Sequence, residues 1–200
     1  MQDRLRDNGI TAVEIRSLIK ELGIAHEVLN VSFSHNKMED EATAALANIL
    51  PLMPKLKQIN LSQNSIGKTG GECLAKTLTN CKFIEEISLG NNNFGDEATA
   101  TWADVLSKMS QLRVLSLSEN ELGSQGALKL SQALSLMKSL KRLDLKLINI
   151  ENKDSVHLAA GLGHCLTIEE VNLECNKITE MGTTKLAEVL KNCSTIKVIR

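Results

Sequence analysis

The chain has 200 residues, of which 42% are hydrophobic and 24% charged, and its formal net charge at pH 7 is −1. This balance excludes the strongly basic surface that is typical of nucleic-acid binding and of anionic membranes, so we expect neither partner. No apolar segment follows Met1, and no apolar stretch is long enough to cross a bilayer. These two features predict a cytoplasmic location.

Residues 1–27 form the first predicted unit, which is a partial copy of a pattern that fills the rest of the chain. Its matching residues are Leu5, Asn8, Ile10, Leu18 and Leu22. Six complete copies follow in residues 28–195, and another partial copy occupies residues 196–200. The pattern returns every 28 residues without a slip. A fixed period of this size is typical of a solenoid built from stacked repeats.

The complete copies are easiest to align by counting Leu56 as position 1 of its repeat. From there the sequence reads LKQINLSQNSI, and it returns as IEEISLGNNNF from Ile84, LRVLSLSENEL from Leu112 and IEEVNLECNKI from Ile168. An earlier copy begins at Val28 and a degraded one at Leu140. Neither end of the array has a polar cap, which exposed terminal repeats normally need. We therefore expect residues 1–200 to be a single array that belongs to a longer one.

Each repeat begins with a predicted short strand. Its apolar residues stand at positions 1, 4 and 6, as in Leu56, Ile59 and Leu61. Leucine and β-branched residues dominate these positions, which is typical of a buried parallel strand.

An asparagine recurs after the strand, because position 9 is asparagine in five of the six complete repeats. These residues are Asn36, Asn64, Asn92, Asn120 and Asn176. The chain turns away from the sheet there, which leaves backbone groups without partners in the ladder. An inward amide has both donors and acceptors for them, so a stacked asparagine ladder is expected.

The second half of each repeat is predicted to be a helix, because leucines recur four residues apart on one face. The pairs are Leu46 with Leu50, Leu74 with Leu78, Leu130 with Leu134, Leu158 with Leu162, and Leu186 with Leu190. Trp102 replaces a leucine of this set, so we expect it in the core. Small residues near the helix start, at Gly70, Ala98, Gly126 and Gly182, predict a close approach to the strand layer.

Stacking such units predicts an α/β solenoid shaped like a horseshoe, with a parallel sheet on the concave face and helices on the convex face. The blocks quoted above, with tails such as GGECLAKTL at Gly70 and GTTKLAEVL at Gly182, resemble the ribonuclease-inhibitor class of leucine-rich repeats. This resemblance covers nearly the whole chain. It implies a protein-interaction or ligand-sensing module rather than an enzyme, and it implies no cofactor.

Three families with this repeat imply different functions. The amino-acid sequence of the repeats most resembles that of the C-terminal region of the NOD-like receptors of innate immunity. That resemblance implies sensing of a protein partner or microbial ligand and restraint of an ATP-binding NACHT domain in cis. Ribonuclease inhibitor and the GTPase-activating protein of Ran imply enzyme regulation instead. The five cysteines, the balanced charge and the lack of an acidic tail count against them. A structural spacer is the third alternative.

The predicted partner-binding residues occupy outward positions of the strands on the concave face. They are Lys57, Gln58, Glu85, Glu86, Arg113, Lys141, Arg142, Asp144, Glu169 and Glu170. Their signs alternate from repeat to repeat. One interpretation is a patterned face that steers a partner into register. The other is a set of lateral ion pairs that neutralise one another and contribute little energy.

The repeat that begins at Leu140 departs from the others. Ile148 stands at the ladder position, and Asp154 replaces the small residue near the helix start. Leu147 follows the strand at a position next to Cys175 of the next repeat, which suggests a small apolar contact. The alternative is decay of the repeat, with Asn149 shifted by one and a local change of the backbone.

No catalytic group and no metal site are predicted. The four histidines stand at different repeat positions, and no nucleophile pairs with any of them. His157, His164, Cys165 and Cys193 fall in neighbouring helices but lack the compact spacing of zinc ligands. The five cysteines form no disulfide framework, so buried free thiols are expected.

Overall fold

The computed structural model describes residues 9, 11–15, 17, 25–191 and 193–200. All six complete repeats lie within this part of the chain apart from residue 192. The predicted partial repeat at the start is only partly covered, because Leu5, Asn8, Ile10, Leu18 and Leu22 lie outside the described residues.

Strands and helices alternate through the repeats. The strands are β1 (Asn30–Ser32), β2 (Gln58–Asn60), β3 (Glu86–Ser88), β4 (Val114–Ser116), β5 (Arg142–Asp144), β6 (Glu170–Asn172) and β7 (Val198–Ile199). The α-helices are α2 (Asp40–Ala47), α3 (Lys68–Leu78), α4 (Gly95–Leu106), α5 (Gly123–Leu134), α6 (Asn152–His164) and α7 (Glu180–Leu190). Two 3-10 helices, η2 (Ala25–Glu27) and η3 (Leu50–Leu52), complete the order of elements.

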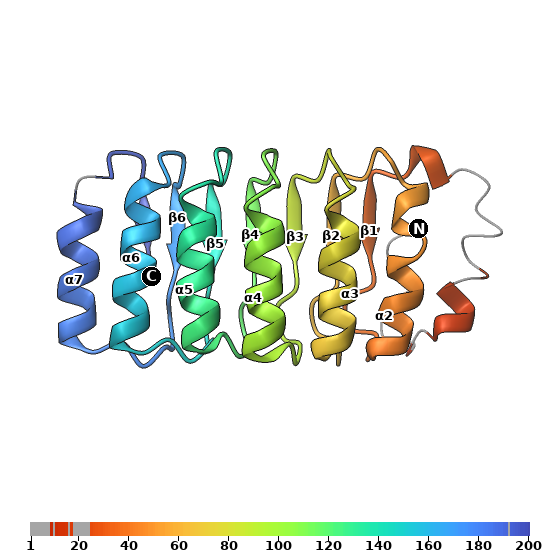
Figure 1. Cartoon of the computed structure of the whole chain (residues 1–200), viewed down its shortest axis with the longest axis horizontal. Coiled ribbons are helices and arrows are strands. Elements are labelled where there is room, and N and C mark those ends of the chain that lie inside the picture. Colours follow the sequence, from red (N-terminus) through yellow and green to blue (C-terminus); the bar gives the residue numbers. More distant parts are fainter. Residues whose placement is uncertain (1–8, 10, 16, 18–24, 192) are drawn as a thin grey trace.

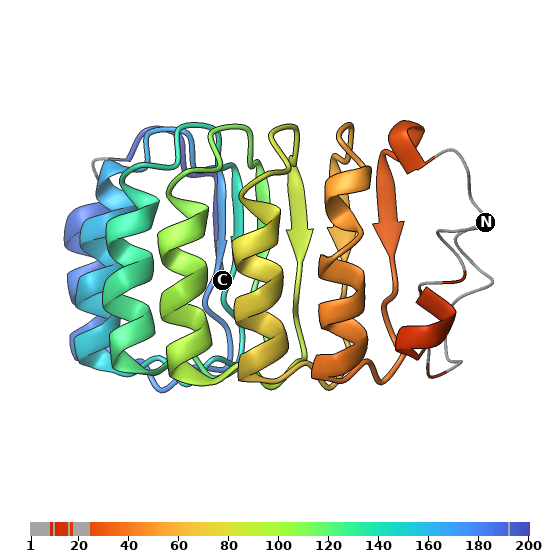
Figure 2. The same ribbon diagram turned by 45° about the vertical axis from the view of Figure 1, so that its right-hand side comes forward.

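The strands form one parallel sheet in chain order from β1 to β7. Each residue pairs with the equivalent residue of the next repeat, so that Asn30 faces Gln58 and Gln58 faces Glu86. The helices lie in a second layer on one side of the sheet (Figures 1 and 2). In Figure 1 the row of helices is visibly longer than the row of strands, which places the sheet on the inner side of the curve. The predicted solenoid is therefore confirmed.

The core lies between the two layers and is built from the predicted strand and helix positions. Leu56, Ile59 and Leu61 are at most 1% exposed. The five leucine pairs of the helices are also buried. Trp102 is fully buried, with its ring centroid 6.2 Å from that of Phe94. Trp102 is therefore a core residue, as predicted.

The first helix of the repeats is shorter than its pattern suggests. Helix α2 ends at Ala47, and Leu50 lies in the 3-10 helix η3 instead. Pro51 explains this end, because its ring lacks an N–H donor and would clash with the carbonyl group four residues earlier. Leu50 nevertheless remains fully buried, so the packing survives the change of helix type.

The asparagine ladder is present and is best seen at Asn64. Its Nδ2 donates to the carbonyl oxygens of Phe33 and Leu61, both at 2.9 Å. Its Oδ1 accepts the backbone N–H groups of Asn36 at 3.0 Å and Met38 at 2.9 Å. With a longer fifth bond to the carbonyl oxygen of Ser62, at 3.4 Å, this one side chain joins two consecutive repeats.

The ladder is interrupted in the Leu140 repeat. The Ile148 side chain is buried there, and the backbone N–H of Leu122 donates to the carbonyl oxygen of Ile148 at 3.3 Å. Asn149 is exposed and has a left-handed backbone, so it does not take over the ladder position. A local change of the backbone therefore replaces the amide, as the decay interpretation expects, whereas its expectation that Asn149 takes over the position is wrong.

The residue before the ladder position adopts a left-handed backbone in all six repeats, with φ between 53° and 61°. These residues are His35, Gln63, Asn91, Glu119, Leu147 and Cys175. The turn away from the sheet requires this conformation, which costs side chains other than glycine about 1 kcal/mol. The side chains at this position stand on the outside of the turn, where Cys175 and Leu147 are exposed.

The small residues near the helix starts make room for the preceding repeat, and not for the strand layer as predicted. Asp40 accepts the backbone N–H of Gly67 at 2.7 Å, at the start of the next repeat's helix. A Cβ atom on Gly70 would lie 2.7 Å from Oδ1 of Asp40. Asp96 accepts the N–H of Gly126 in the same way, at 2.6 Å. These carboxylates cap helices across the repeat boundary.

Helix lengths also bear on membranes. None of the described helices is long and apolar enough to span a bilayer.

Candidate functional site on the outer face of the sheet

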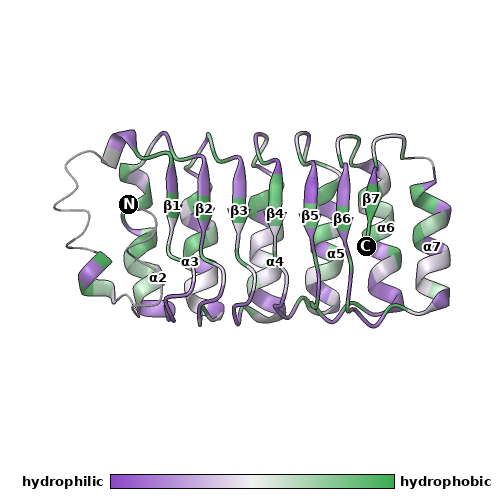
Figure 3. Ribbon diagram, turned by 180° about the vertical axis from the view of Figure 1, so that it is seen from behind, coloured by the Kyte–Doolittle hydropathy of each residue, from purple (hydrophilic) through white to green (hydrophobic). Residues whose placement is uncertain are grey.

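Strand geometry decides which side chains the sheet presents on its concave face. Successive residues of a strand point to opposite sides, so the middle residue of each strand faces the core and its two neighbours face outward. In β2, Ile59 is buried, whereas Gln58 is exposed and Asn60 is half-buried. Figure 3 shows this side of the sheet in front of the helices, with hydrophilic residues on strands β1, β2, β3, β5 and β6, whereas β4 and β7 are more hydrophobic.

All ten predicted partner-binding residues lie on or next to strands β2 to β6 of this face. Gln58, Glu86, Arg142 and Glu170 are the first residues of their strands. Lys57, Glu85, Arg113, Lys141 and Glu169 directly precede those first residues, and Asp144 ends β5. The register places equivalent positions of successive repeats side by side, so nine of the ten residues form two lateral rows, and Asp144 lies at the other end of its strand.

Two glutamates organise the row that precedes the strands. Glu85 contacts Lys57 at 3.0 Å and Arg113 at 4.0 Å. Glu169 contacts Lys141 at 2.7 Å and Lys197 at 2.6 Å. Both glutamate side chains are about 30% exposed, whereas their basic partners are more open. Each glutamate is therefore held between two cations from the flanking repeats.

The pKa values of these glutamates reflect their neighbours. The hydrogen bond from Lys57 lowers the pKa of Glu85 below its ordinary value of 4.5. Hydrogen bonds from Lys141 and Lys197 lower the pKa of Glu169 from 4.5 to about 2. The same contact with Glu169 raises the pKa of Lys197. Sequence reasoning left Lys197 out of the predicted set, although its place in the alternating row was the available signal.

The row within the strands is less paired. Among the residues that the structure describes, Glu86, Arg142 and Glu170 form no ion pair within 4.0 Å. Asp144 is engaged differently, because it accepts the N–H of Lys146 and the hydroxyl of Ser116, each at 3.2 Å. Asp144 thus shapes the end of its strand and is less available to a partner than its charge suggests.

A shallow hollow of about 210 Å³ lies over the first three strands. Its polar lining consists of Asn30, Ser32, Gln58, Asn60, Glu86 and Ser88. The hollow is deepest over the small residues that end the strands, such as Ser32 and Ser88, and is bordered by the residues that begin them, such as Gln58 and Glu86. This end of the face is nearly neutral, so it offers hydrogen-bonding groups with little net charge.

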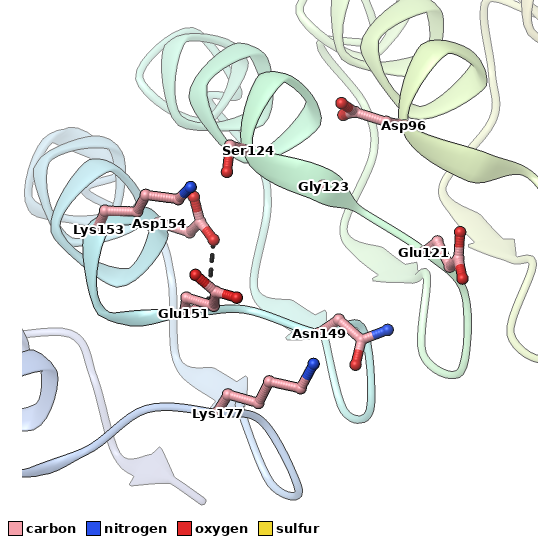
Figure 4. Close-up of a pocket in the computed structure, with 9 residues that line it drawn as sticks. All are labelled: Asp96, Glu121, Gly123, Ser124, Asn149, Glu151, Lys153, Asp154 and Lys177. Atoms are coloured by element: carbon pink, nitrogen blue, oxygen red, sulfur yellow. Dashed lines mark hydrogen bonds between the residues drawn. The ribbon is translucent and has the colours of Figure 1, made fainter.

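A second polar pocket, of about 260 Å³, lies at the loop edge between the starts of α5 and α6 (Figure 4). It is lined by Asp96, Glu121, Gly123, Ser124, Asn149, Glu151, Lys153, Asp154 and Lys177. Asp154 is 3% exposed, and its Oδ2 accepts the backbone N–H of Glu151 at 3.1 Å. Asp154 therefore caps its own helix, whereas Asp40 and Asp96 cap the helix of the following repeat.

The cysteines and histidines do not gather at either pocket. Cys81 and Cys165 are buried, and burial raises the pKa of both thiols, which keeps them protonated. Cys175 is exposed, so the prediction of buried thiols is wrong there, because the left-handed turn directs its side chain outward. Within the described part of the chain, no group of three or more histidine, cysteine or acidic side chains is arranged to hold a metal ion.

Comparisons with known proteins agree with this architecture. A family model described as a leucine-rich repeat matches residues 53–75 and 108–131. No curated protein sequence matches the chain. The tropomodulin C-terminal domain of Caenorhabditis elegans superposes with a TM-score of 0.63 at 13% identity, over 76% of this chain and 93% of that domain. TLR13, solved in complex with ssRNA13, superposes with a TM-score of 0.55 at 17% identity, over 98% of this chain but 29% of that chain.

Proposed function

For this chain, which is a leucine-rich repeat protein, we propose that the concave face of the sheet binds a protein partner. The observation that carries the proposal is the ordered row of outward polar and charged residues on strands β2 to β6. The buried core and the asparagine ladder hold these residues at fixed spacing. A rigid, preorganised surface binds with little loss of conformational entropy. The role proposed is binding without catalysis.

The ion pairs of this face support docking only in part. Exposed pairs contribute about 0–1 kcal/mol each, so their purpose is not mainly the stability of the fold. Complementary charges instead raise association rates and fix the register of a partner. Arg142, Glu86 and Glu170, which form no ion pair with any described residue, are the ones available for new contacts.

A pull-down from cytosolic lysate with mass-spectrometric readout tests the proposal. The concave variant changes Glu85, Glu86, Lys141 and Arg142 to alanine. The matched convex variant changes Glu72, Lys76, Asp104 and Lys129, which form two ion pairs elsewhere on the surface. Both variants remove two acids and two bases, so the net charge is unchanged. Circular dichroism and thermal melting confirm that each variant is folded.

We expect a partner that the wild type and the convex variant retain and the concave variant loses. Equal retention by both variants would place docking elsewhere on the molecule. A wild type that captures no specific partner would favour the spacer alternative.

We further propose that the chain is a sensing and autoinhibitory segment of a cytosolic NOD-like receptor of innate immunity. The 28-residue repeat with a helix behind every strand supports this finer proposal. The flanking coding sequence tests it. A NACHT domain upstream is the expected result, whereas an acidic tail downstream would favour regulation of a GTPase instead.

A further inference from the structure

Like charges meet at one place in the row that precedes the strands. In chain order the row reads Lys57, Glu85, Arg113, Lys141, Glu169 and Lys197. Arg113 and Lys141 are the only two neighbours of the same sign in it. The backbone N–H of Lys141 donates to the carbonyl oxygen of Arg113 at 2.8 Å, so the two residues lie side by side. Arg142 follows on β5, and we call Arg113, Lys141 and Arg142 the basic cluster.

The two arginines of the basic cluster are weakly neutralised. Arg113 approaches Glu85 only through Nε, at 4.0 Å, while Lys57 holds the same carboxylate at 3.0 Å. Arg142 has no ion pair within 4.0 Å among the described residues, whereas Lys141 is engaged by Glu169. The Arg113 side chain is 58% exposed, and Arg142 is exposed as well. The planar forks of both guanidinium groups are therefore free to bind carboxylates, which they do in a bidentate manner.

Arg113 and Lys141 repel each other, unlike the other neighbours in this row. Like charges opposite each other on neighbouring strands destabilise a sheet. The alternating signs elsewhere in the row avoid this cost, since each glutamate lies between two bases. Two neighbouring exposed guanidinium groups, of which one has a single long contact with a carboxylate and the other has none among the described residues, indicate binding of an anionic group. Val114, half-buried beside Arg142 in the register of β4 and β5, adds an apolar floor.

The surroundings limit the shape of that anionic group. Glu85 and Glu86 flank the basic cluster on the β3 side, and Glu169 and Glu170 flank it on the β6 side. Neighbouring strands are about 4.8 Å apart, so the cationic strip is roughly 10 Å wide. A long acidic chain that crossed the whole sheet would meet repulsion from both flanks. A short acidic block with basic residues on either side matches this order of an acidic, a basic and an acidic strip.

We propose that the basic cluster binds the carboxylate groups of a short acidic segment of the protein partner, and that basic residues flank this segment. Arg113 and Arg142 supply two guanidinium groups for bidentate contacts, and Lys141 adds a third positive charge. This inference rests on the proposed docking role of the concave face and names the chemistry that the face recognises.

Fluorescence anisotropy with labelled peptides tests the inference directly. The probe peptide has a central block of glutamates flanked by lysines, and its control has glutamines in that block. The protein variant is R113Q/R142Q. Its matched control is K76Q/K129Q, which removes the same charge from helices α3 and α5. Thermal melting of R113Q/R142Q should show little change in stability, because the one ion pair that it removes, Arg113 with Glu85 at 4.0 Å, is long and exposed.

We expect the wild type and K76Q/K129Q to bind the glutamate peptide within about twofold of each other, with affinity that falls as salt increases. Binding by R113Q/R142Q should be about tenfold weaker or more, since two charge-assisted contacts are lost. Binding of the glutamine peptide should be similarly weak. Equal binding by both variants, equal binding of both peptides, or no binding by the wild type would overturn the inference.

A lysate pull-down with R113Q/R142Q, run beside the concave alanine variant, separates this inference from the proposed function. If R113Q/R142Q retains a partner that the concave alanine variant loses, the concave face still docks but the basic cluster is not the contact. If both variants retain it, the two proposals fail together.

Discussion

Single residues in this protein matter most where they serve two repeats at once. Asn64 satisfies backbone groups of its own repeat and of the preceding one through five hydrogen bonds. In a solenoid each repeat contacts only its neighbours, so such links carry much of the cohesion between repeats. Ile148 shows that one link is dispensable when the backbone supplies an acceptor instead.

Replacing Asn64 by alanine should therefore be costly. The change leaves buried donors and acceptors unpaired, and we expect a loss of about 3 kcal/mol in the free energy of unfolding. Gln58→Ala is the control, because Gln58 is exposed, and it should change that free energy by less than about 0.5 kcal/mol. Urea denaturation measures both. Similar midpoints for the two variants would show that the ladder is not cohesive.

At the scale of elements, contacts between neighbouring helices depend on small residues. Helices α5 and α6 approach closely at Gly161, where an added Cβ atom would lie 2.3 Å from the carbonyl oxygen of Ser131. At Gly163 the same atom would meet only Cγ1 of Val189, at 2.7 Å. The backbone cannot move aside as the end of a valine side chain can. The two glycines of one helix thus have different roles.

This difference predicts opposite effects of the same substitution. Alanine favours a helix by up to about 1 kcal/mol over glycine, and Gly163→Ala should gain part of this. For Gly161→Ala the clash with the backbone outweighs that gain, and we expect a net loss of about 1–3 kcal/mol. Urea denaturation of the two variants compares them directly. Equal midpoints would mean that α5 and α6 can separate at no cost.

Across the whole molecule, the charged rows tie neighbouring repeats together along the concave face. Glu169 joins Lys141 and Lys197, which belong to the repeats on either side of it. The two contacts lower the pKa of Glu169 to about 2 in the folded state, from an ordinary value of 4.5. Because the folded pKa is depressed, the stabilisation by Glu169 is present above pH 4.5 and is lost as the pH falls towards 2.

Wild type and Glu169→Gln should therefore differ in stability in a pH-dependent way. Near neutral pH we expect a small decrease in the urea midpoint of the variant, which shrinks in high salt because the pairs are exposed. The difference should disappear as the pH falls from 4.5 towards 2. Glu170→Gln is the control, since Glu170 forms no ion pair among the described residues. A difference that persists at the acid end would contradict the assignment to this carboxylate.

The sequence by itself determined the repeat, the parallel sheet, the buried leucines and the asparagine ladder. The physical reason is that a fixed period of 28 residues brings equivalent residues side by side, so hydrophobic pattern and register follow from spacing alone. It also predicted that the charged residues share one face. Periodicity cannot give the contacts of individual side chains, however, because these depend on rotamers and distances of about 3 Å.

Tertiary structure alone decided three features that bear on function. Glu169 pairs with both flanking lysines, whereas Arg142 forms no ion pair within the described part of the chain, although both belong to the predicted charged face. Asp40 and Asp96 cap helices of the following repeats, so Gly70 and Gly126 make room for these carboxylates and not for the strand layer. The left-handed turn exposes Cys175 and Leu147. Each outcome depends on packing between repeats, which the pattern within one repeat does not contain.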